Sequence, residues 1–175
     1  MSITAHLTEQ FILKKKFSKF NIRWLIAGSY IPDGWGIDRF FMFYDTGFHR
    51  DYVFGWMHSL LLPIIFALPV RFIFGKWSFW SFLFSIELHI LTDVLDTAGV
   101  KLLWPFNDIK YSVGIFPWYE NGIIADLIIY FTTPASLIFE LIFLIWAFFV
   151  IYNLGSGNIW LGLKKFWHLD SWFDK

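Results

Sequence analysis

The residues best suited to chemistry lie in one stretch, HILTDVLDTAGVKLLWPF, from His89 to Phe106. In an α-helix, residues four and seven positions apart return to nearly the same side, so His89, Asp93 and Asp96 are expected to project together. Hydrophobic residues cover the rest of that helix. Imidazole and carboxylate groups are the side chains that bind divalent cations such as Zn²⁺. The stretch therefore predicts metal ligands on one face of a helix.

The composition indicates a membrane protein. The chain has 175 residues, enough for one domain, and 57% of them are hydrophobic, which is more than a soluble domain carries. An ionised group near the hydrocarbon core costs on the order of 3 kcal/mol even on the permissive insertion scale. Two carboxylates and an imidazole on one helix face would therefore need compensation, which a bound divalent cation provides.

Charge and cysteine content exclude nucleic-acid binding through overall charge, and also disulfides and thiolate metal sites. The 14 basic and 14 acidic residues cancel, so no overall charge recruits nucleic acid. Cysteine is absent, which excludes disulfides and thiolate ligands. Only His, Asp and Glu side chains remain as candidates for a tight metal site.

The hydrophobic pattern predicts an all-α integral membrane bundle with about four membrane segments, formed by one domain over residues 1–175. Residues 1–21 mix large apolar side chains with lysines, which is typical of a helix at the membrane surface. Residues 22–152 form the expected bundle, and Pro134 is expected to kink its long last segment. Residues 153–175 contain lysines and tryptophans and are expected to form an interfacial tail. The expected membrane segments are 22–31, 58–74, 77–96 and 123–152.

Positive charge predicts the orientation of the chain. Membrane proteins keep most Lys and Arg residues in the cytoplasm, and a cytoplasmic N-terminus with four segments places 10 of the 14 basic residues there. The same topology puts Asp33, His58, His89 and Asp93 toward the outer side. Separate segments are thus predicted to converge at one depth and to supply two imidazoles and two carboxylates to a metal ion.

The same topology assigns the other polar residues to the outer or the inner side of the membrane. His49 lies beside the outer cluster and is a further ligand candidate, whereas His6 and His168 fall on the inner side and are left out of the site. Glu120 and Asp126 flank the outer start of the fourth segment, where we expect interfacial residues.

The motifs resemble those of a known family. Pro32-Asp33, His49-Arg50, the run from His58 to Leu61 and above all the His89–Phe106 stretch look like the membrane-bound metal-dependent hydrolases of the YdjM type, the LexA-associated inner-membrane family. The resemblance covers about residues 31–110. It departs from the family pattern at Asp38, which stands five residues after Asp33 instead of two. The set is similar, more distantly, to the zinc-dependent phospholipase C and P1 nuclease group.

This resemblance implies a bacterial inner-membrane hydrolase that uses a divalent metal ion, with zinc as the expected ion. Asp96 could bind a second metal ion, orient His89 or act as the base, or it could be a helix-terminal carboxylate at the headgroup region. Arg50 could neutralise a phosphate in the transition state or mark the membrane interface.

The leading functional hypothesis is hydrolysis of a phosphoester or lipid-linked substrate at the outer membrane–water interface, with Asp96 and Arg50 as catalytic candidates. The alternative is a non-catalytic structural subunit of a larger membrane complex built on the hydrolase scaffold. A transporter is a third option, but the chain has no inverted repeat. The expected partners are the lipid bilayer, a lipid or phosphoester substrate and other membrane proteins.

Overall fold

The computed structural model describes residues 3–33, 57–117 and 123–167, and these residues form seven helices and no strand. The predicted all-α class is therefore confirmed for the described part of the chain. The helices, listed in chain order, are α1 (Ile3–Lys16), α2 (Ile22–Tyr30), α5 (Leu62–Phe74), α6 (Lys76–Asp93), α7 (Ile123–Thr132), α8 (Pro134–Leu154) and α9 (Ile159–Trp167).

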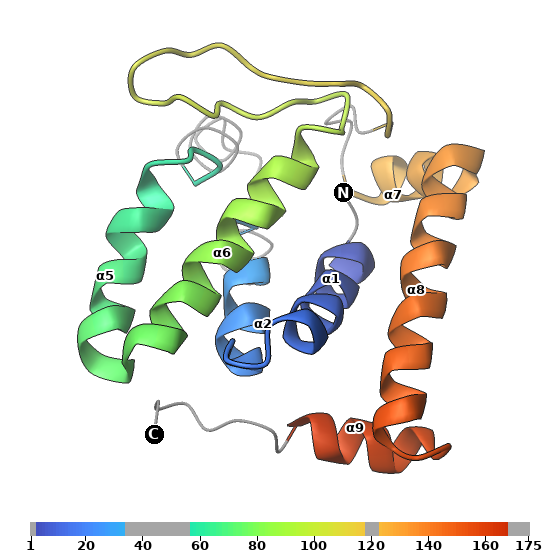
Figure 1. Cartoon of the computed structure of the whole chain (residues 1–175). Helices are drawn as coiled ribbons and strands as arrows, with labels where there is room; N and C mark the ends of the chain where they lie inside the picture. The colour runs from blue at the N-terminus through green and yellow to red at the C-terminus, as the bar shows by residue number, and fades with distance from the viewer. Residues whose placement is uncertain (1–2, 34–56, 118–122, 168–175) are drawn as a thin grey trace.

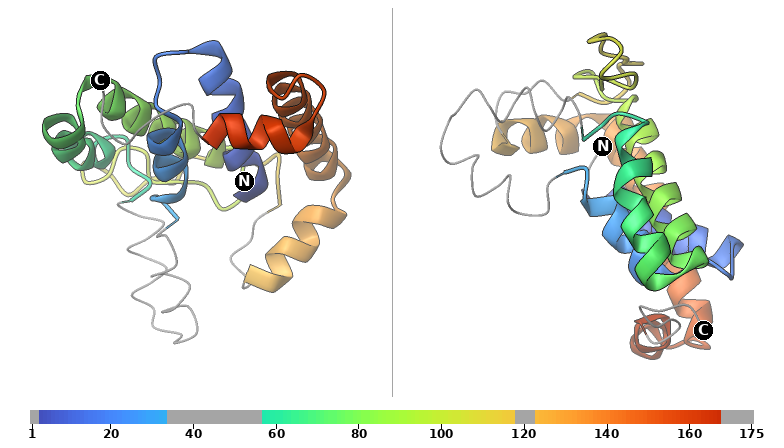
Figure 2. Two further views of the ribbon diagram at one scale, coloured as in Figure 1. Left: turned by 90° about the horizontal axis from the view of Figure 1, so that it is seen from below. Right: turned by 90° about the vertical axis from the view of Figure 1, so that its left-hand side faces the viewer.

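Five helices pack as a row. α5 packs against α6, α6 against α2, α2 against α1 and α1 against α8, while α9 lies across one end of the row (Figure 1). α7 turns away from the start of α8, as the view from below also shows (Figure 2). Because the row is one helix thick, its apolar residues can face outward on both sides.

Local sequence signals begin and end these helices. Asn21 caps α2, since its side-chain oxygen accepts a hydrogen bond from the amide of Arg23 at 3.1 Å. Gly75 has φ 104°, which favours glycine, and it joins α5 to α6 in a tight turn. Pro134 begins α8 and separates it from α7, so the predicted interruption of the long fourth segment is confirmed as a break between two helices.

α6 is shorter than the sequence suggests. The stretch around Asp96 was expected to continue the helix, but α6 ends at Asp93, and Asp96 lies in the loop that follows. The amides of Val113 and Ile115 donate to the carbonyls of Val94 and Leu95 at 2.7 and 2.8 Å. This pairing draws the chain into a long loop, residues 94–117, which covers one end of the row (Figure 1).

One helix is long and apolar enough to cross a membrane by length and composition among the described residues. This helix is α8, with 21 residues, while α5 is apolar but has only 13. Both carry exposed apolar side chains, such as Phe72, which is 83% exposed on α5, and Phe149, which is 54% exposed on α8. Exposed apolar residues in this number are typical of a surface that faces lipid or a partner protein.

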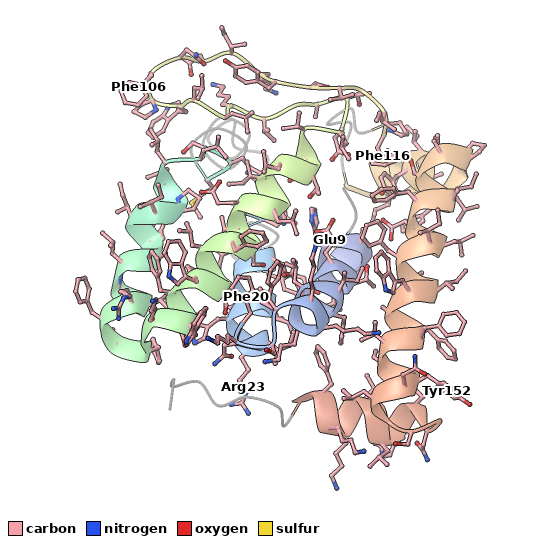
Figure 3. The ribbon with its side chains drawn as sticks, viewed as in Figure 1. Glu9, Phe20, Arg23, Phe106, Phe116 and Tyr152 are labelled. Carbon is pink, nitrogen blue, oxygen red and sulfur yellow. The ribbon has the colours of Figure 1, made fainter. Side chains whose placement is uncertain are left out.

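Basic residues mark one end of the row. The α1–α2 turn, the α5–α6 turn and α9 lie at that end, and the loop 94–117 lies at the other (Figure 1). Figure 3 shows the same separation, with Arg23 at one end and Phe106 at the other. We call the first the basic end; its described members are Lys14, Lys15, Lys16, Lys19, Arg23, Arg71, Lys76, Lys164 and Lys165.

α2 and α6 approach closely at a glycine. A Cβ atom added to Gly28 would lie 2.6 Å from the carbonyl oxygen of Phe82 and 2.9 Å from the Cβ of Ser85. These atoms belong to the backbone and the first side-chain atom of α6, so they cannot rotate away. Gly28 therefore sets the spacing between α2 and α6.

We expect Gly28→Val to lower the free energy of unfolding by about 1–3 kcal/mol, because the added side chain overpacks this contact. Thermal melting in detergent measures the change. Ala135→Val, at an exposed position of α8, is the matched control and should leave the melting temperature unchanged. Equal melting temperatures for both variants would contradict the assignment of Gly28 to helix spacing.

Candidate metal centre

A stripe of polar residues runs along the buried face of α6. Ser78, Ser81, Ser85 and His89 are each 0% exposed, and their spacing of three and four residues places them on one helix face. The Ser85 hydroxyl donates to Gln10 Oε1 at 2.9 Å, and this bond joins α6 to α1. At the end of the stripe the serines give way to His89 and Asp93.

Two further segments bring side chains to the same end of α6. Asp33 follows the end of α2 by three residues, and His58 precedes the start of α5. The amide of Leu60 donates to the carbonyl of Leu102 at 3.0 Å, which anchors the segment around His58 to the covering loop. The structure thus brings together Asp33, His58, His89 and Asp93, as the sequence predicts.

The four side chains offer one ligand atom each, and these atoms all lie within 4.8 Å of one another. Asp93 Oδ2 lies 3.2 Å from His58 Nε2 and 3.1 Å from His89 Nε2. Asp33 Oδ1 lies 3.8 Å from His58 Nε2 and 3.5 Å from His89 Nε2. In a tetrahedral zinc site with bonds of ~2.1 Å, neighbouring ligand atoms are separated by about 3.4 Å. The four separations given above, from 3.1 to 3.8 Å, lie near that value.

The burial of the two histidines is also consistent with a bound cation. His58 and His89 are 1% and 0% exposed, and neither ring nitrogen of His89 makes a hydrogen bond of good geometry. A buried polar atom without a hydrogen bond is costly, and a metal ion bound at Nε2 of His89 would remove that cost for one of its two nitrogens. Two carboxylates would cancel the two charges of the ion. The group could therefore hold a divalent metal ion.

His6 also belongs to this cluster, which the sequence analysis did not foresee. His6 Nε2 lies 3.2 Å from Asp93 Oδ1, and the His6 ring stacks on the His89 ring with centroids 3.8 Å apart. The expectation that His6 lies with the lysines is wrong, because α1 runs from the cluster toward the basic end (Figure 1). Residues 3–16 were expected to lie at the membrane surface, but α1 packs between α2 and α8.

His6 lies beside Oδ1 of Asp93, whereas the other two imidazoles lie beside Oδ2. Its Nδ1 lies 3.5 Å from Thr92 Oγ1 and 3.9 Å from Glu9 Oε2, and Glu9 is 5% exposed. Glu9 comes from the same helix, near the cluster end of α1 (Figure 3). A hydrogen-bonding partner of this kind fixes the orientation of a metal-binding carboxylate and tunes its affinity.

Asp96 does not join the four ligand residues. Its amide donates to the carbonyl of Asp93 at 3.1 Å, and its own carbonyl accepts a hydrogen bond from Ser112 Oγ at 2.5 Å. The residue is 6% exposed, and burial raises the pKa of its carboxyl to about 6. A carboxyl with such a pKa can exchange protons near neutral pH.

Several candidates lie outside the described residues. The roles of these residues stay predictions: His49, Arg50, Asp38, Glu120 and His168. Asp126 was also named from the sequence; its backbone lies in α7, but its side chain is outside the described part. No clear signal in the sequence marks His6, because the buried face of α1 includes the polar residues His6, Glu9 and Gln10 and so lacks the apolar period of a packed helix.

We expect His6→Gln to weaken metal binding about 10–100-fold, because Asp93 loses the group that orients it. Chelator competition on detergent-purified protein measures the dissociation constant. Thr8→Ala is the control, since this buried residue of the same helix bonds only the Ala5 carbonyl among the contacts described. Unchanged affinity in His6→Gln would show that His6 does not position Asp93.

Comparison with known proteins places the chain in a family. The family model described as YdjM inner membrane protein matches residues 3–161, which include His6 and all four ligand residues. No curated protein and no solved structure matches the chain. With nearly the whole sequence covered by that model, the chain belongs to the YdjM inner membrane protein family.

Proposed function

We propose that this protein is a membrane-embedded metal-dependent hydrolase. The observation that carries the proposal is the buried group of Asp33, His58, His89 and Asp93, with ligand atoms within 4.8 Å of one another at one end of the helix row. Two imidazoles and two carboxylates form a donor set that suits zinc. Such donors are costly to bury in a membrane protein without a role for them.

We propose that the basic end faces the cytoplasm, following the positive-inside rule. The bundle would then cross the membrane with α8, α5, α6 and the α1–α2 pair as its four membrane segments. The metal group would lie at the outer interface, as the sequence analysis expects. In this arrangement the start of α1 also lies on the outer side, which replaces the expectation of a cytoplasmic N-terminal segment.

The chemistry follows from the residues at the site. A bound zinc ion supplies Lewis-acid catalysis and activates water near neutral pH. Asp33 borders the accessible side of the group, since its side chain is 39% exposed whereas those of His58 and His89 are 1% and 0% exposed. We assign to Asp96 the transfer of a proton and to Arg50 the neutralisation of a phosphate charge.

The proposed substrate is a phosphoester or a lipid-linked molecule. A site at headgroup depth is within reach of groups at the membrane surface. The covering loop adds exposed apolar side chains at the same end, including Phe106 and Ile109, which are 81% and 58% exposed. Such residues can insert among headgroups and keep a lipid substrate near the site.

One observation favours a structural role instead. Four protein ligands complete a tetrahedral zinc site, whereas catalytic zinc sites keep a position open for water or substrate. In that case the ion would stabilise the junction of α2, α5 and α6. The exposed apolar faces of α5 and α8 would then be available to partner subunits.

Phosphoester hydrolysis by metal-loaded protein separates the two roles. We expect wild-type protein in mixed micelles to hydrolyse phosphatidic acid or bis(p-nitrophenyl) phosphate. Asp96→Asn should lower kcat by about 10²–10⁴-fold without loss of bound metal, because it removes the proton-transfer group. Phosphate or nitrophenol release gives the rate, and elemental mass spectrometry gives the metal content.

Asp108→Asn is the matched control for this experiment. Asp108 lies in the same loop, and its exposed carboxylate pairs with Lys101 at 3.0 Å. Its loss should leave kcat unchanged. Metal-loaded wild-type protein that hydrolyses neither substrate would favour the structural role.

A further inference from the structure

A groove that runs from α9 along the α1–α2 pair has features of a lipid site. It has a volume of about 530 Å³, within the range of roughly 300–1,000 Å³ that is usual for ligand pockets. One wall comes from the α1–α2 pair, through Leu7 and Phe11 on α1 and Ile26 and Tyr30 on α2. The groove is separate from the metal centre, whose ligands none of these residues supplies.

The other wall comes from α9. Phe166 is 4% exposed, and its ring lies 4.3 Å from the ring of Phe11, so this end of α9 is docked on the α1–α2 pair. The opposite end is less covered, since Trp160 is 79% exposed and Leu163 is 40% exposed. α9 thus rests on the row near Phe166 and leaves an apolar groove along the rest of its length.

Lys164 is the one charged residue that lines the groove among the described residues. Its ammonium group belongs to the basic end, where the ends of α1, α5 and α9 gather their lysines and arginines. An apolar channel beside a cation is complementary to an amphiphile with a hydrocarbon chain and an anionic head. Anionic phospholipids of the cytoplasmic leaflet have this chemistry, and basic segments at the membrane surface attract them.

We infer that the groove between α1, α2 and α9 binds one acyl chain of an anionic phospholipid, with the phosphate of the headgroup at Lys164. The bound lipid fills the space between α9 and the α1–α2 pair and so fastens α9 to the row. This site does not depend on the metal centre. The lipid here is a bound ligand and not a substrate, and its headgroup lies at Lys164, away from Asp33, His58, His89 and Asp93.

The test uses full-length protein in mild detergent with dioleoyl phosphatidylglycerol or dioleoyl phosphatidylcholine, and native mass spectrometry counts bound lipids. Wild-type protein should retain one phosphatidylglycerol and prefer it to phosphatidylcholine. Lys164→Gln should weaken phosphatidylglycerol binding about fivefold, the effect of one lysine charge near a membrane surface. Lys165→Gln, the neighbouring lysine outside the groove, is the matched control and should bind as wild type does.

A second variant tests the apolar part of the site. Leu163→Trp places a larger side chain in the groove and should weaken the binding of both lipids, while metal content stays the same. Equal losses in Lys164→Gln and Lys165→Gln would overturn the placement of the headgroup. Absence of a stoichiometric phosphatidylglycerol on the wild type, or a fatty acid or second protein copy in its place, would overturn the proposal as a whole.

Discussion

The close approach of two carboxylates and three imidazoles at one end of the helix row is the constraint on which the other features depend. Asp93 lies at its centre, because one oxygen lies near His6 and the other near His58 and His89. Each of these groups is costly to bury alone in a membrane protein. With neutral imidazoles the two carboxylates leave a charge of −2, which a divalent cation would cancel. The cluster thus explains why α1, α2, α5 and α6 meet at this end.

The remaining polar residues support that meeting. The serine stripe of α6 lets α2 approach closely at Gly28, and Ser85 links α6 to both Gln10 and the carbonyl of Leu25. These contacts place the start of α1 and the end of α2 beside the last turn of α6. Lysines and arginines collect at the far end, about 25 Å away along α6 at 1.5 Å per residue. The two ends therefore differ in chemistry, and the proposed membrane orientation rests on that difference.

Sequence reasoning predicted the helical class and the convergence of Asp33, His58, His89 and Asp93 for physical reasons. The His-x-x-x-Asp spacing returns both side chains to one helix face, and Pro and Gly mark the breaks at Gly75 and Pro134. It missed His6, because four lysines in the first twenty residues suggested a surface helix. Lys14 is 9% exposed, and its ammonium group donates to the carbonyls of Ser18 and Phe20. The lysine whose charge suggested an exposed helix therefore stabilises the turn between α1 and α2. Asp96 lies outside the helix in which it was expected, because residues 113–116 pair with residues 94–97. No local sequence pattern reveals such a long-range contact.

Metal content is the most direct test of this account. Protein purified in detergent with zinc and manganese in the buffer is measured by elemental mass spectrometry, beside His89→Ala and the control Ser85→Ala one turn away. The account predicts close to one ion per chain in the wild type and in Ser85→Ala, and none in His89→Ala. A wild-type protein without metal, folded and pure, would contradict it.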